Sequence, residues 1–300
     1  MLVTMKEILD HASAGNYAVA APDIVSEFDA RAFIEAAEEC NAPLIIDVEY
    51  NSITDIFFIG QMLRQMAMQS SVPIAINLDH GKTRQQVMEA IQAGFNAVMI
   101  DRSASPYEEN AKDVKEIVEL AHSVGISVEA ELGHVGQADN YANDRDAALT
   151  DPEQARRFVE ETGVDCLAVA IGTAHGAYPK GFEPYLDYDR LEQIKKTVGS
   201  LPLVLHGSSG SSYESLRKVC SMGINKVNIS NDLRKAIVSS ITDAYSEEGG
   251  NAYLVFKVAK QAMKDKLKEM IEIYGSCDKA WISKGEGLPK KETYPGKTVR

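Results

Sequence analysis

The sequence predicts a single (β/α)8 barrel of the TIM type, followed by additional helices on its C-terminal side. Eight short apolar runs alternate with amphipathic stretches, and the composition does not break between them. Polar side chains recur where these runs end, which is expected if the carboxyl ends of the strands converge on one face of a barrel. A doubly wound parallel sheet is the alternative fold, but it accounts less well for the polar strand ends.

The apolar runs have the length of buried strands. In order they are Tyr17–Ala21, Leu44–Val48, Ile74–Leu78, Ala97–Ile100, Ile126–Glu131, Cys166–Ile171, Leu203–Leu205 and Lys226–Ile229. The stretches between them repeat apolar residues at helical spacing, and several end in a glycine that can terminate a helix. They are Glu27–Cys40, Asp55–Ser70, Thr83–Ala93, Tyr107–Val124, Pro152–Thr162, Tyr188–Thr197 and Ser212–Met222. Two further helices are expected over Leu233–Tyr245 and Ala252–Ile273.

Length and composition indicate one domain over residues 1–283, with residues 284–300 as a loose tail rich in Lys, Gly and Pro. The chain has 300 residues, 45% of them hydrophobic, which is enough for a large core. Its net charge of −13 gives no electrostatic basis for binding nucleic acid or an anionic membrane surface. The four cysteines are widely spaced, without a CxxC pair, and no run reaches the ~20 apolar residues of a membrane span. We expect free thiols and a cytoplasmic protein.

Three of the apolar runs lead into a histidine that is followed at once by glycine. The segments are LDHG at 78–81, GTAHG at 172–176 and LHGSSG at 205–210. A single histidine at a strand end is ordinarily structural, but three in one pattern would meet at the mouth of a barrel. Neutral imidazoles at three positions, with a fourth position open, are the ligand set of a catalytic zinc site. His80, His175 and His206 are therefore the candidate metal ligands.

Acidic residues are expected on the same face. Asp79 precedes a candidate ligand, Asp101 ends its strand, and Glu129 and Glu131 alternate so that both side chains point the same way. A metal would favour Glu131 and Asp101, either as ligands or as carboxylates that orient the ligands. A solvated strand end or a salt-bridged pair is the other interpretation of the two glutamates.

Two polar loops after the last two strands are candidates for binding phosphate. They are Gly207-Ser208-Ser209-Gly210 and Asn228-Ile229-Ser230-Asn231-Asp232. (β/α)8 barrels often bind phosphate at this place, using loop N–H groups and the N-terminus of a helix.

Taken together, these segments resemble the class II, metal-dependent ketose-bisphosphate aldolases of the fructose- and tagatose-bisphosphate type. The resemblance runs from about Ala18 to about Lys264. It depends on six ordered motifs: LDHG at 78–81, MID at 99–101, EAELG at 129–133, GTAHG at 172–176, LHGSSG at 205–210 and KVNISND at 226–232.

The resemblance implies reversible retro-aldol cleavage of a sugar phosphate. His80, His175 and His206 would hold Zn²⁺ or another divalent metal, and the ion would stabilise an enediolate. Asp79 would remove the proton of the C4 hydroxyl, and Asn228 would hydrogen-bond the enediolate. The C1 phosphate would be held by five residues, with a monovalent cation (Na⁺ or K⁺) nearby. They are Gly176, Gly207, Ser209, Ser230 and Asn231. Family members are homodimers or homotetramers.

Several positions depart from the family pattern. Asp139 stands where the family's mobile loop usually carries a glutamate that exchanges the enediolate proton. The first strand ends at Asp23 rather than in an AFN- or AVN-like segment. Glu49 aligns with a serine or threonine near the distal phosphate, and Lys257 replaces the family's distal arginine. The lysine that often follows GTAHG is displaced to Lys180.

A carboxylate at Glu49 would repel a phosphate dianion in a partly dry site. We therefore expect the triose-phosphate half of the site to be retained and the second phosphate site to be lost. The substrate would be a ketose 1-phosphate or related sugar phosphate, cleaved to dihydroxyacetone phosphate and an aldehyde that is hydroxyl-rich or carries an amino group. Alternatively, Glu49 turns away from the site or pairs with Lys257.

Three other functions stay open at this point. An ordinary fructose- or tagatose-1,6-bisphosphate aldolase would differ only at the distal site. A non-catalytic barrel subunit of an aldolase complex is disfavoured by the complete set of three histidines and Asp79. A metal-independent, phosphate-binding isomerase would leave the three histidines unexplained.

Overall fold

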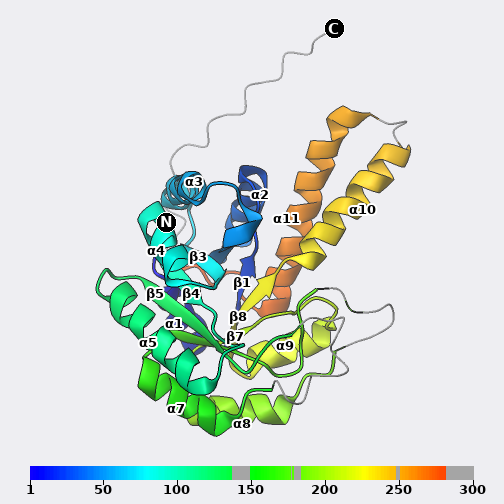
Figure 1. Ribbon diagram of the computed structural model, residues 1–300. Coiled ribbons are helices and arrows are strands. Elements are labelled where there is room, and N and C mark those ends of the chain that lie inside the picture. The colour runs from blue at the N-terminus through cyan, green and yellow to red at the C-terminus, as the bar shows by residue number, and fades with distance from the viewer. Residues whose placement is uncertain (137–148, 177, 179–183, 248–250, 282–300) are drawn as a thin grey trace.

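The computed structural model describes residues 1–136, 149–176, 178, 184–247 and 251–281, and its strands form a nearly closed parallel barrel (Figure 1). In order the strands are β1 (Val19–Pro22), β2 (Leu44–Glu49), β3 (Ile74–Gly81), β4 (Ala97–Ile100), β5 (Ser127–Leu132), β6 (Cys166–Val169), β7 (Leu203–Leu205) and β8 (Ile224–Ile229). Strands that follow one another in sequence pair from β2 to β8, and β1 pairs with β8. Between β1 and β2 the ring is completed by a bridge between Asp23 and Asp47. The predicted fold class is confirmed.

Helices cover the outside of the barrel. They are α2 (Glu27–Glu39), α3 (Ile56–Gln69), α4 (Arg84–Ala93), α5 (Tyr107–His122), α7 (Pro152–Thr162), α8 (Tyr188–Val198) and α9 (Tyr213–Ser221). Capping follows the sequence signals at α7, where the Asp151 side chain accepts from two backbone N–H groups and Gly163 ends the helix with a positive φ of 71°. Alternate strand residues such as Leu44, Ile46 and Val48 point outward and pack beneath these helices.

A second hydrophobic cluster fills the inside of the barrel. It contains Val19, Ala21, Ile45, Ala75, Ala97, Cys166, Ala168 and Val204. Helix α1 (Met5–Gly15) closes the N-terminal end of this cluster with Met5, Ile8, Leu9 and Ala12, all buried. Small and medium apolar residues therefore form the floor, and Asp79, Glu131 and Asn228 lie toward the carboxyl ends of β3, β5 and β8.

The two C-terminal helices form a long antiparallel hairpin that extends away from the barrel (Figure 1). They are α10 (Asn231–Glu247) and α11 (Val255–Tyr274), with a short 3₁₀ turn η3 (Ala252–Leu254) before α11 and another, η1 (Tyr50–Ser52), after β2. α11 returns along α2, where Lys260, Lys264 and Lys268 pair with Glu35 and Glu39. The expected tail at 284–300 lies outside the described residues.

None of the helices in the described ranges is long and apolar enough to cross a membrane. All four cysteines are free thiols, and three of them are buried.

Candidate active site

Asp79 and His80 both reach the mouth of the barrel, although they are neighbours on one strand. In a regular strand, adjacent side chains point to opposite faces. Here the pairing of β3 with β4 shifts between Leu78 and Gly81, and His80 takes a left-handed φ of 47°. Such a conformation costs a residue other than glycine about 1–2 kcal/mol. The irregularity lets one strand supply two functional side chains.

Two of the three glycines that follow the histidines have a steric reason. A Cβ at Gly81 would lie 2.6 Å from the carbonyl oxygen of Met99. Gly207 has a φ of +65°, and a Cβ there would lie 2.5 Å from the Ala174 backbone. The chain beyond each of these histidines therefore passes close to the neighbouring strand or loop, which a side chain would prevent.

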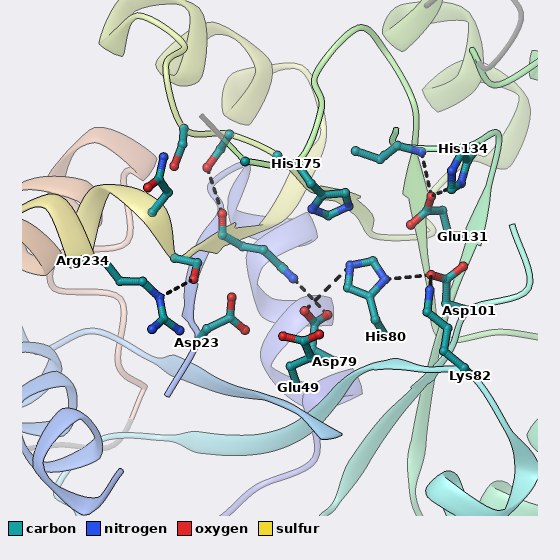
Figure 2. Close-up of a pocket in the computed structure, with 18 residues that line it drawn as sticks. Asp23, Glu49, Asp79, His80, Lys82, Asp101, Glu131, His134, His175 and Arg234 are labelled. Carbon is teal, nitrogen blue, oxygen red and sulfur yellow. Dashed lines mark hydrogen bonds and ion pairs between the residues drawn. The ribbon is translucent and has the colours of Figure 1, made fainter. Parts of the chain in front are cut away.

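The three predicted histidines and Glu131 come together at the carboxyl ends of the strands. One ligand-type atom from each of His80, His175, His206 and Glu131 lies within 4.8 Å of the others. Nε2 of His80 lies 3.0 Å from Nδ1 of His206, and the rings of His80 and His175 meet edge to face with centroids 4.9 Å apart. Figure 2 shows His80, His175 and Glu131 facing a common space.

Hydrogen bonds on the far side of two rings determine which nitrogens face that space. Nδ1 of His80 donates to Asp101 (2.8 Å), and Nε2 of His206 donates to Glu129 (2.8 Å), because a carboxylate can only accept. In the neutral imidazoles, the lone pairs of His80 Nε2 and His206 Nδ1 then point toward each other. This arrangement favours a cation between them, and N/O donors at this spacing could hold a metal ion.

Asp101 lies behind His80 rather than in the group of four ligand-type residues. It also accepts from Ser103 Oγ (2.7 Å) and pairs with Lys82. Burial raises the pKa of Asp101, but the hydrogen bonds from His80, Lys82 and Ser103 outweigh it and hold that pKa well below its usual range. Asp101 is therefore placed where it could orient the His80 ring, whereas Glu131 belongs to the group of four ligand-type residues.

Asp79 lies beside the imidazole group, and its carboxylate accepts from Asn228 Nδ2 (3.1 Å). Burial raises the pKa of Asp79, but His80, His206 and Lys226 lower it to about 2, so the carboxylate is ionised. Lys226 is fully buried, 2.9 Å from Asp47 and from Glu129. Glu129 is therefore part of a buried salt bridge, the alternative that the sequence left open for it.

All five residues predicted to hold phosphate line one cavity of about 470 Å³ next to this group. They are Gly176, Gly207, Ser209, Ser230 and Asn231. Asn231 and Ser230 lie at the N-terminal end of α10, where backbone N–H groups and the helix dipole favour an anion.

The distal residues are only partly brought together. Asp23 and Glu49 line the cavity, and Glu49 accepts from Ser52 Oγ (2.6 Å), so it does not turn away from the site. Burial and the neighbouring Asp79 raise the pKa of Asp23 to about 7. Lys257 is exposed on α11 and is not among the described residues that line the cavity. Asp139 and Lys180 lie outside the described residues.

Several residues of the site were missed by the sequence reasoning. Lys82, His134 and Arg234 line the cavity, and Figure 2 shows Arg234 near Asp23 with Lys82 on the opposite side. Arg234 Nε donates to Ser230 Oγ (3.2 Å) and forms no ion pair with a described carboxylate. A signal existed for Lys226, a charged residue inside an apolar run two positions before Asn228.

Comparison with known proteins agrees with this geometry. The family model described as "Fructose-bisphosphate aldolase class-II" matches residues 3–279. A fructose-bisphosphate aldolase of Thermus caldophilus is 37% identical, with 93% of this chain and 100% of that protein covered. One from Helicobacter pylori (strain J99) has the same identity and coverage.

Solved structures give the same result. The YdjI aldolase of Escherichia coli K12 superposes with a TM-score of 0.83 at 33% identity, covering 93% of this chain and 100% of that one. A putative fructose-1,6-bisphosphate aldolase of Coccidioides immitis gives 0.80 at 28% identity, covering 91% and 96%. The motifs, the barrel and these matches together show that the chain belongs to the class II fructose-bisphosphate aldolase family, whose members are lyases.

Proposed function

We propose that this enzyme is a metal-dependent aldolase that cleaves a ketose 1-phosphate, or a related sugar phosphate, to dihydroxyacetone phosphate and an aldehyde. The observation that carries the proposal is the convergence of three imidazoles and Glu131 beside Asp79 and a phosphate-type cradle in one cavity. Retro-aldol cleavage needs a polarised carbonyl, a base for a hydroxyl proton and an anchor for the phosphate.

His80, His175 and His206 would hold the ion, with Glu131 near enough to join or support them. Zinc suits this mixture of nitrogen and oxygen donors, and another divalent ion is the alternative. When bound, the ion would supply Lewis-acid polarisation of the substrate carbonyl.

The other steps belong to the protein. The Asp79 carboxylate would accept the proton of the C4 hydroxyl in cleavage and return it in condensation. Asn228 would donate to the enediolate oxygen. Asp139 would give a proton to the carbon of the enediolate in cleavage and remove it in condensation. The cradle of Gly176, Gly207, Ser209, Ser230 and Asn231 would bind the C1 phosphate, together with a monovalent cation. A cytoplasmic homodimer or homotetramer completes the proposal, and its free thiols suit a reducing compartment.

The distal end of the cavity supports an acceptor without a phosphate. Glu49 faces the cavity from the exposed end of β2, and its negative charge repels a phosphate dianion there. Asp23 and Glu49 could both accept hydrogen bonds from a polyhydroxylated or amino-bearing aldehyde. Lys257 would contribute only if the distal group reaches α11.

Incubation with dihydroxyacetone phosphate in D₂O tests the first half of the reaction. We expect stereospecific loss of one C3 proton by NMR, abolished by a chelator and by His206→Ala. A folded, metal-loaded enzyme that leaves the proton in place would refute the proposed half-reaction and favour a non-catalytic barrel subunit.

Arg234 favours a second candidate, an ordinary fructose- or tagatose-1,6-bisphosphate aldolase. Its guanidinium lines the cavity without a described carboxylate partner, and such a group binds phosphate well. The two candidates are separated by comparing kcat/KM for a ketose 1-phosphate with kcat/KM for the 1,6-bisphosphate.

Glu49→Ser sharpens this comparison. Removing the carboxylate should raise kcat/KM for the bisphosphate about tenfold or more, on the order of 1.4 kcal/mol, and leave the 1-phosphate within threefold. Ser52→Ala, which removes the hydroxyl that Glu49 accepts from, is the matched control. A wild-type preference for the bisphosphate, unchanged by Glu49→Ser, would establish the second candidate.

A further inference from the structure

We propose that Lys226 is a positioning residue, which sets the hydrogen-bonding direction of Asn228 and, through Glu129, of His206. The inference rests on the proposed function, because Asn228 and His206 have their catalytic meaning only there. Neither the family resemblance nor the sequence pattern assigned a role to this lysine.

Lys226 lies on β8 in the closed interior of the barrel, with no exposed side-chain surface. Three oxygens from three strands surround its ammonium group: Asp47 Oδ2 at 2.9 Å, Glu129 Oε2 at 2.9 Å and Asn228 Oδ1 at 2.7 Å. Burial lowers the pKa of Lys226, but Asp47 and Glu129 outweigh it and raise that pKa above its usual value. The group is therefore a permanent cation with three donors and no acceptor.

The first consequence concerns the amide of Asn228. Because Lys226 can only donate, the amide must turn its oxygen toward the lysine. Its NH₂ group then faces the mouth of the barrel and donates to Asp79 (3.1 Å). With the opposite orientation, two donors would face each other at Lys226 and two acceptors at Asp79. Lys226 thus selects the orientation in which Asn228 can donate to the carboxylate and to a substrate oxygen.

The second consequence concerns the ring of His206. Glu129 has one oxygen against Lys226 and the other against His206 Nε2 (2.8 Å). The Glu129 carboxylate accepts a hydrogen bond from the Nε2–H group of His206. Nδ1 of the same ring faces His80 and the group of ligand-type residues. The ion pair with Lys226 holds this carboxylate in place beneath the ring, a type of support that tunes metal ligands.

Lysine is well suited to this position because its ammonium group lies close to oxygens that belong to three different residues. A flexible stem with a tetrahedral head can serve all three, whereas the planar guanidinium of arginine presents its donors in a fixed fork. The side-chain amide of Asn77 donates to Asp47 Oδ1 (2.9 Å) and so helps to fix the Asp47 carboxylate beside Lys226. The ammonium group therefore has little freedom to move away from Asn228.

A double-mutant cycle on the metal-loaded full chain tests the inference. The rate of C3 proton exchange from dihydroxyacetone phosphate in D₂O is measured for wild type, Lys226→Met, Asn228→Ala and the double variant. Loss of a single preorganised donor typically costs about 100-fold in rate. We expect Asn228→Ala to lose about that much, Lys226→Met at least tenfold, and the double variant to match Asn228→Ala within threefold.

The KM for cleavage of a ketose 1-phosphate should stay within threefold in Lys226→Met while kcat falls, because the cradle for phosphate is untouched. Lys264→Met, at a lysine that also pairs with two carboxylates but lies on α11, is the matched control and should exchange at the wild-type rate. Circular dichroism and metal content are measured on every variant. If Lys226→Met does not fold, the cycle is run in an Asp47→Asn background, which removes one of the two carboxylates that the lost lysine would leave unpaired, with the same expected coupling.

Losses that simply multiply in the double variant would overturn the inference, because Lys226 would then act independently of Asn228. A Lys226→Met variant that exchanges at the rate of its parent, in the wild-type or the Asp47→Asn background, would overturn it as well. The proposed function fails separately, and visibly, if the wild-type enzyme itself shows no exchange that a chelator abolishes.

Discussion

The molecule contains two clusters in which lysine pairs with two carboxylates, and they serve different ends. In the barrel, Lys226 lies 2.9 Å from Asp47 and 2.9 Å from Glu129, with all three side chains fully buried. Between α2 and α11, Lys264 lies 3.3 Å from Glu35 and 2.6 Å from Glu39, whose side chains are 40% and 42% exposed. Distances are similar, so solvent exposure is what separates the two.

Solvent exposure determines how each cluster contributes to the stability of the fold. Water screens the α2–α11 pairs, which stabilise the fold by about 0.2–1 kcal/mol each. Burial makes the barrel pairs expensive to form and more expensive to break, since removing one partner leaves an uncompensated charge. A protein gains little stability from such a buried cluster compared with apolar packing. Its presence under the site points to a functional reason, the orientation of Asn228 and His206.

The largest expected effect is on stability when the buried lysine is removed. Lys226→Met should lower the free energy of unfolding by about 3–5 kcal/mol, because Asp47 and Glu129 would remain buried without a cation. Urea denaturation followed by circular dichroism measures the change. Lys264→Met is the control and should lose no more than about 1 kcal/mol. Equal losses in the two variants would show that burial does not distinguish the clusters.

A second prediction concerns the metal that the buried region is proposed to bind. A chelator should lower the free energy of unfolding by about 2.7 kcal/mol if the ion is present at 100 times its dissociation constant. His80→Ala should remove this response, because it removes one ligand. Glu39→Gln should keep it, since the α2–α11 cluster has no part in binding the ion. A chelator response that persists in His80→Ala would place the stabilising ion elsewhere.

Added salt should change the unfolding free energy that the surface cluster contributes but not the one that the buried cluster contributes, and this effect is smaller than the first two. Glu39→Gln should destabilise by less than about 1 kcal/mol at low ionic strength, and the loss should shrink in 1 M NaCl, where charges are screened within about 3 Å. The loss caused by Lys226→Met should be unaffected by salt because solvent ions cannot enter the interior. The measurement is the difference in unfolding free energy at two salt concentrations.

The smallest effect is the pH dependence of the surface pairs. The hydrogen bond from Lys264 lowers the pKa of Glu39 below its usual value. A carboxyl group whose pKa is lower in the folded state than in the unfolded state stabilises the fold at pH values above its unfolded-state pKa. This contribution is lost as the pH falls through the folded-state pKa. The difference between wild type and Glu39→Gln should therefore be present at pH 6, at a few tenths of a kcal/mol, and shrink as the pH falls through the folded-state pKa of Glu39. A difference that grows on acidification would contradict this sign.

The sequence alone determined the order of elements and most of the site. Ala97–Ile100 and Leu203–Leu205 were predicted with the bounds that the structure has, because short apolar runs between helices leave little choice. The three histidines, Asp79 and the phosphate loops could be predicted as candidate site residues because each lies at or just beyond the end of an apolar run. That position can be seen from the order of residues along the chain. Local order is information that a sequence carries directly.

What only the tertiary structure decided depends on contacts between strands distant in sequence. Lys226, Asp47 and Glu129 look like three isolated charges in apolar runs, and only the closed barrel shows that the two carboxylates pair with the same lysine. The shifted pairing at His80 and the approach of Arg234 to the cavity likewise need the fold. The physical reason is that the energy of a charge depends on its distance to other charges and on burial, and both quantities exist only after the chain has closed.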